Sequence, residues 1–234
     1  MQDLSILHLF LNQSMRSLRP LLLLLVTALP FASSLRAAQE ILSAETVLAD
    51  PVHDPAWSEL FRALAAPKNR VSRFEERRHF PFRETPIVLT GEIRIIPGRG
   101  LSLSYLTPKP QMVIVDDAGV LLRDERGRQR SAPADSRAQA ATAALFSILR
   151  FDLPDLARQF VIHGTRAETT WTLGFVPKDP ALAALMGTVI VEGEAMRINR
   201  IDLTKSDHQR IEIIILGTME DVIFGDEVVK RFFR

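Results

Sequence analysis

The sequence has no cysteine and almost no excess of either charge. The absence of cysteine excludes a disulfide-stapled scaffold, a thiol nucleophile and lipid attachment to a cysteine behind a leader. The 29 basic and 28 acidic residues give a net charge of +1, so we expect no nucleic-acid partner. With 47% hydrophobic residues among 234, the chain is unlike a disordered protein and is long enough to bury a sizeable core.

Signatures of catalysis and of metal binding are also missing from the sequence. It contains no nucleophile elbow, no phosphate-binding loop and no zincin helix, and its histidines are not spaced like paired ligands. We therefore expect a protein that is not an enzyme, without catalytic residues, metal or cofactor. One alternative is a hydrolase in which His163 acts with Asp152 or Glu168, although an ordinary strand-end histidine is the simpler interpretation.

The first 38 residues have the order of a secretory signal. Arg16 and Arg19 form a basic region, residues 21–29 form an apolar run, and small residues up to Ala38 form a cleavage zone. The apolar run is shorter than the roughly 20 residues that span a bilayer. We therefore expect export, with residues 1–38 as the signal region.

Residues 1–14 precede this basic region and fit no part of a signal. We therefore expect the true start at Met15. Residues 39–234 contain no long linker and no internal repeat, and we expect them to form a single domain.

Most of this domain alternates apolar and polar residues, as half-buried strands do. In the segment 71–80, for example, Phe74, Glu76, Arg78 and Phe80 share one face. The same period of two, or a short apolar segment next to a turn, predicts further strands at residues 89–95, 101–105, 112–115, 120–123, 161–166, 171–176, 189–194, 196–203 and 210–217.

Four segments have helical signals instead. They lie at residues 55–66, 134–149, 153–160 and 180–186. Aspartate followed closely by proline marks the start of the first, third and fourth. The second is rich in alanine along one stripe, which lets a helix approach a sheet closely. Residues 124–137 are charged and polar, and they are typical of an exposed connection.

About ten short strands, each with one apolar face, must curl or split, because a flat open sheet would leave apolar surface in water. The sequence therefore predicts an α+β fold: an incomplete antiparallel β-barrel of about ten strands, with helices covering an apolar inside. That inside is either a packed core or a ligand cavity, and the pattern leaves both open.

Two features each have a structural and a functional interpretation. Arg78 shares a face with Phe74 and Phe80, so it requires either an acidic partner or an anionic ligand head group. Glu76 on the same face is the simpler partner. The closing residues 228–234 mix apolar and basic side chains, and a docked or frayed tail is a simpler interpretation than a membrane contact.

Two strand motifs, in this order and spacing, resemble those of a known family. Phe74, Glu76 and Arg78 form a Phe-x-Glu-x-Arg strand, and residues 171–177 read Trp-Thr-Leu-Gly-Phe-Val-Pro. The second is similar to a Trp-x-Leu-x-Leu-x-Pro motif with phenylalanine at the last leucine. Together they resemble the LolA-related periplasmic lipoprotein carriers, over about residues 57–217.

The resemblance implies an incomplete barrel in the periplasm, lidded by helices, whose apolar cavity shields acyl chains. It implies a monomer that delivers lipid or acylated cargo from an inner-membrane donor to an outer-membrane acceptor, with transient membrane contact. A LolA-like lipid-sensing regulatory module is the alternative. The lipid-binding residues expected on this basis are Phe74, Ile93, Leu103, Phe146, Trp171, Leu173 and Phe175, with Arg78 and Glu76 as polar groups in the cavity.

Two departures from the family pattern bear on the cargo. The turn after the second strand reads Ile96-Pro97, where the family has Arg-Pro with an arginine that helps to hold the lid closed. Glu76 stands where the carrier motif has glutamine. Both changes point away from lipoprotein handling and from the same gating, and a glycerolipid or a polyene lipid remains an alternative cargo.

Overall fold

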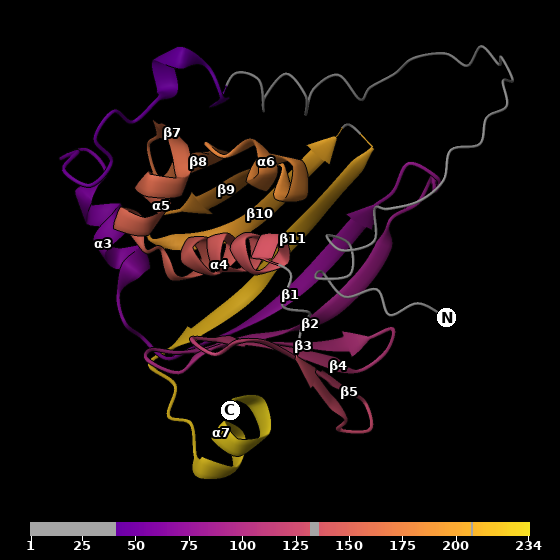
Figure 1. Cartoon of the computed structure of the whole chain (residues 1–234). Helices are drawn as coiled ribbons and strands as arrows, with labels where there is room; N and C mark the ends of the chain where they lie inside the picture. The colour runs from indigo at the N-terminus through magenta and orange to yellow at the C-terminus, as the bar shows by residue number, and fades with distance from the viewer. Residues whose placement is uncertain (1–40, 132–135, 207) are drawn as a thin grey trace, which may run out of the picture.

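The computed structural model describes residues 41–131, 136–206 and 208–234 (Figure 1). The predicted signal region 1–38, the proposed start at Met15 and residue Ala134 of the predicted second helix lie outside these residues. No helix within the described ranges is long and apolar enough to cross a membrane.

The strands form one open sheet in which every neighbouring pair is antiparallel. Its order is β6-β5-β4-β3-β2-β1-β11-β10-β9-β8-β7, so the first strand pairs with the last at the centre. The bounds are β1 Arg70–His79, β2 Ile87–Ile96, β3 Gly100–Thr107, β4 Gln111–Asp116, β5 Gly119–Asp124, β6 Gln129–Ser131, β7 Phe160–Ala167, β8 Thr170–Pro177, β9 Thr188–Glu194, β10 Arg197–Ser206 and β11 Gln209–Glu220.

The predicted α+β fold with an incomplete antiparallel barrel is confirmed, with eleven strands in place of about ten. The additional strand is β6, which falls within the segment 124–137 that the sequence predicts to be an exposed connection. Its three residues are all exposed, so it carries no apolar alternation by which a strand is recognised.

The helical elements of the described residues are η1 Ala44–Thr46, a 3-10 turn, and the α-helices α3 Ser58–Ala65, α4 Ser136–Arg150, α5 Leu153–Gln159, α6 Pro180–Met186 and α7 Asp226–Phe232. Asp152 and Asp179 cap α5 and α6 by accepting backbone N–H bonds, as their positions before proline predict. α3 begins three residues later than expected, because Pro55 lies in a turn that precedes the helix.

The inner face of the sheet and the helices α3 to α6 bury one continuous apolar core. Two strand glycines allow large rings to lie flat across this face. A Cβ on Gly91 would lie 2.8 Å from the Phe74 ring, and one on Gly193 would lie 2.1 Å from the Trp171 ring. Because Gly91 lies between them, Phe74 on β1 and Tyr105 on β3 meet edge to face, with ring centroids 5.5 Å apart.

The short helix α7 packs on the outer face of β2 to β5, on the side of the sheet opposite α4 (Figure 1). Phe233, which follows it, is 2% exposed. The Arg94 guanidinium lies 3.7 Å from the centroid of the Phe232 ring, and Arg234 Nε pairs with Asp116 Oδ2 at 2.9 Å. The closing residues are therefore docked, which is the simpler of the two interpretations drawn from the sequence.

Replacing Phe233 with alanine should lower the free energy of unfolding by about 3 kcal/mol, because it removes a buried aromatic ring. The control is Ile223→Ala in the segment before α7, where the side chain is 94% exposed. That variant should stay within about 0.5 kcal/mol of the parent. Urea unfolding measures both, and an equal loss in the two variants would contradict the docked position of Phe233.

Candidate functional site

A polar group lies buried within the inner face of β1 and β3. Glu76, Arg78 and Tyr105 are each at most 1% exposed. Arg78 Nε donates to Glu76 Oε1, and the Tyr105 hydroxyl donates to Glu76 Oε2 at 2.9 Å. Burial, and next the Glu76 carboxylate, raises the pKa of Tyr105 well above its usual value, so the hydroxyl keeps its proton and donates. Arg78 thus has the acidic partner on its own strand that the sequence offers.

Replacing Glu76 with glutamine should lower the free energy of unfolding by about 3–5 kcal/mol, because the buried Arg78 guanidinium loses this carboxylate. The control is Glu75→Gln on the same strand. Glu75 pairs with Arg77 at 2.7 Å, but these side chains are 27% and 45% exposed. The control should change by less than about 1 kcal/mol in urea unfolding. Similar losses of unfolding free energy in both variants would show that burial does not increase the contribution of the Glu76–Arg78 pair to stability.

The side chains expected to bind lipid lie within the packed core. Six of them are at most 6% exposed, and they are Phe74, Ile93, Leu103, Trp171, Leu173 and Phe175. Phe146 is partly buried, and the Arg150 guanidinium lies 4.8 Å from its ring centroid. None of the seven lines the cavity described below. Their role as lipid contacts stays a prediction.

A cavity of about 690 Å³ lies at one end of the inner face, where α3, the start of β1, the end of β2 and the junction of α4 with α5 meet. Its apolar lining includes Phe61, Leu64, Ile95, Leu149, Phe151 and Leu153. The turn residues Pro97 and Gly98 also line it, so the turn that lacks the family arginine forms part of the wall. Small-molecule sites typically occupy roughly 300–1,000 Å³.

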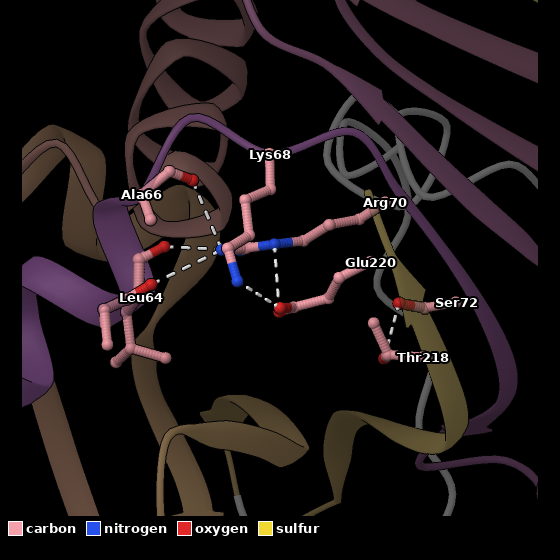
Figure 2. A network of polar contacts seen from close by, with 8 residues as sticks. Leu64, Ala66, Lys68, Arg70, Ser72, Thr218 and Glu220 are labelled. Carbon is pink, nitrogen blue, oxygen red and sulfur yellow. Dashed lines mark hydrogen bonds and ion pairs between the residues drawn. The ribbon is translucent and has the colours of Figure 1, made fainter. Parts of the chain in front are cut away.

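Arg70 ties α3 to the sheet beside this cavity (Figure 2). Its guanidinium donates to the carbonyl oxygens of Leu64 at 3.3 Å and Ala66 at 3.3 Å, at the C-terminal end of α3. Its Nε lies 3.5 Å from Glu220 Oε1 on β11. A cation at a helix C-terminus satisfies free carbonyls and complements the helix dipole. Arg70 therefore fixes one wall of the cavity.

Lys68 joins the same network, since its Nζ lies 2.6 Å from Glu220 Oε2 (Figure 2). This hydrogen bond raises the pKa of Lys68 and lowers the pKa of Glu220, so both groups are charged near neutral pH. Arg62 and Arg150 complete the basic lining of the cavity, and Asp152 supplies its acidic group.

The residues of the hydrolase alternative are not brought together. His163 is 6% exposed, and its Nδ1 lies 3.0 Å from Thr46 Oγ1 and 3.2 Å from the Ser43 carbonyl oxygen. Asp152 caps α5, and Glu168 occupies the turn between β7 and β8. Within the described ranges, no three His, Cys, Asp or Glu side chains are grouped so that they hold a metal ion.

The cavity-lining residues Arg62, Leu149, Arg150 and Leu153 are not among those expected from the sequence. Periodicity marks Phe61 as a buried helix residue, and it marks Ile95 as an inward strand residue. Periodicity does not predict which helix end lies against which strand end. The position of the cavity depends on that tertiary arrangement.

No protein-family model matches the chain, and no curated protein matches it. Among solved structures, the chain is similar in fold to LolA superfamily proteins. One is a LolA superfamily protein from Nitrosomonas europaea, with a TM-score of 0.43 and 6% identity over 73% of this chain and 95% of the other. Another is a putative outer membrane lipoprotein-sorting protein domain from Vibrio parahaemolyticus, with a TM-score of 0.44 and 8% identity over 74% and 94%.

The Pseudomonas aeruginosa MucA/MucB complex is a further match, with a TM-score of 0.43 and 15% identity over 74% of this chain. The chain spans 59% of the matched chain in that complex. These similarities concern the fold.

Proposed function

We propose that this protein is a periplasmic, non-enzymatic carrier that shields the acyl chain of a lipid in the cavity between α3, the α4–α5 junction and the inner ends of β1 and β2. The observation that supports the proposal is the cavity itself, with about 690 Å³ of space and a partly apolar lining. The signal-like order of residues 1–38 supports the compartment.

An acyl chain leaves a membrane only for a site that buries it comparably, at about 0.8 kcal/mol per methylene. The cavity offers apolar side chains from three separate elements: Leu64 on α3, Ile95 on β2 and Leu149 on α4. Such apolar walls bind a hydrocarbon chain without any covalent step. Transfer then requires only differential affinity between a membrane donor, the carrier and an acceptor.

The helices over the cavity provide a means of changing that affinity. α3 is held to the sheet by its buried residues Leu60, Phe61 and Leu64, and Arg70 on β1 adds hydrogen bonds to its C-terminal carbonyls. α4 continues into α5 through Phe151 and Asp152. Separation of α3 from the α4–α5 junction would widen the cavity. In this proposal, inner-membrane and outer-membrane partner proteins favour the open arrangement through transient contact.

Filling the cavity should weaken the binding of an uncharged lipid. Ala65 is exposed on α3 and lines the cavity, so Ala65→Trp places an indole there without disturbing the core. The matched control is Ala143→Trp, at an exposed alanine of α4 that does not line the cavity. Titration with monoolein, followed by native mass spectrometry, should show one bound lipid for the parent and the control. The Ala65 variant should bind at least about tenfold more weakly.

Failure of the parent to bind monoolein, or equal binding by both tryptophan variants, would contradict a lipid site in this cavity. Protein purified from the periplasm provides an independent measurement. We expect it to carry co-purifying lipid that native mass spectrometry detects and that extraction identifies, and consistently empty protein would count against the carrier.

A further inference from the structure

The residues that line the cavity have a higher net positive charge than the chain as a whole. Arg62, Lys68, Arg70 and Arg150 line it against a single acid, Asp152, which gives 4 − 1 = +3. Including Glu220, which contacts Lys68 and Arg70, leaves +2. The whole chain has a net charge of only +1. Excess positive charge is therefore concentrated around this cavity.

Two of these cations already have hydrogen-bond or ion-pair partners within the protein. Arg70 donates to the α3 carbonyls, and Lys68 pairs with Glu220 at 2.6 Å. The one acid of the lining is occupied as well, because the Asp152 side chain accepts the Asp155 backbone N–H at 3.2 Å. Asp152 is held at the N-terminus of α5, and within the described residues it forms no ion pair with Arg62 or Arg150.

Arg62 on α3 and Arg150 at the end of α4 differ from them. Both are exposed, and within the described ranges neither guanidinium has a carboxylate within ion-pair distance. The Arg150 guanidinium carbon lies over the Phe146 ring, 4.8 Å from its centroid. Two arginines from separate helices thus border a partly apolar cavity, and among the described residues neither has an ion-pair partner.

We propose that Arg62 and Arg150 form an anionic head-group subsite, so that the lipid bound by this protein carries a phosphate or carboxylate at the end of its acyl chain. This inference rests on the proposed function. The chain occupies the apolar wall of Leu64, Ile95 and Leu149, and the head group lies at the rim. Arginine binds both acid groups through paired, charge-assisted hydrogen bonds, and a partly desolvated site strengthens them.

The test uses two lipids that differ only in the phosphate. 1-Oleoyl lysophosphatidic acid and 1-monoolein share the acyl chain and the glycerol. We expect the parent protein to bind the phosphorylated lipid at least about tenfold more tightly, as two arginine contacts to one acid group would give. Glycerol 3-phosphate, which lacks the chain, should show no measurable binding, and oleate serves to compare a carboxylate with the phosphate.

The variant is Arg62→Gln combined with Arg150→Gln. It should lose about tenfold in affinity for lysophosphatidic acid while monoolein binding stays within about twofold. The control is Arg83→Gln combined with Arg126→Gln, which removes the same charge at two exposed arginines that do not line the cavity. The control should bind both lipids as the parent does, and the preference of the parent should weaken as salt is raised.

Each result bears on the subsite in a distinct way. If monoolein binds but lysophosphatidic acid binds no more tightly, or if the control loses as much affinity as the variant, the subsite is wrong and the carrier proposal stands. If glycerol 3-phosphate binds as tightly as lysophosphatidic acid, the arginines bind free phosphate and the lipid assignment is wrong. If neither lipid binds the parent, both proposals fail. A preference for lysophosphatidic acid or oleate that only the Arg62 and Arg150 variant loses supports the subsite.

Discussion

The inner face of the sheet has to be covered, and the rest of the molecule follows from how that is done. Inward residues of the central strands are almost all apolar, and helices α3 to α6 supply the apolar surface against which they pack. The helices come from three separate stretches of the chain. Where α3 and the α4–α5 junction meet over the ends of β1 and β2, their side chains leave a cavity. The cavity is thus a space between helices that come from separate segments of the chain.

Two arginines on β1, one buried in the inner face and one beside the cavity, have different kinds of partner. Arg78, deep in the inner face, has Glu76 from its own strand beside it, and Tyr105 completes the carboxylate's hydrogen bonds. Arg70, the first residue of β1, donates its N–H groups to carbonyl oxygens at the C-terminal end of α3. The first arrangement compensates a charge that has left water. The second connects the C-terminal end of α3 to β1 beside the cavity.

Strands such as β1 and β2 could be predicted from the sequence because buried and less buried residues alternate along them. β1 alternates so regularly that its inner residues follow from the period alone, and the proline-marked starts of α5 and α6 hold as well. β6 and α7 were missed since neither carries a periodic apolar pattern, and α7 is stabilised by contacts such as Arg94 with Phe232 that exist only in the folded chain. The position of the cavity was not predicted for the same physical reason, because it depends on which helix ends meet which strand ends in the folded chain. Trp171, which is expected to bind lipid, lies in the core, where Gly193 lets its ring lie against the sheet, and its role as a lipid contact stays a prediction.

For a carrier, apolar walls alone would not select a cargo. A membrane buries each methylene about as well as a protein cavity does, so moving a chain between the two changes the free energy little, whatever the chain. Selection must then come from the head group, whose surroundings differ more between a hydrated membrane surface and a rim with two arginines. The same charges would also allow release, because an acceptor that binds the head group competes directly with Arg62 and Arg150 at the exposed end of the cavity. In the proposed carrier, selective contacts at the rim and unselective contacts inside the cavity would let one site both select a lipid and release it.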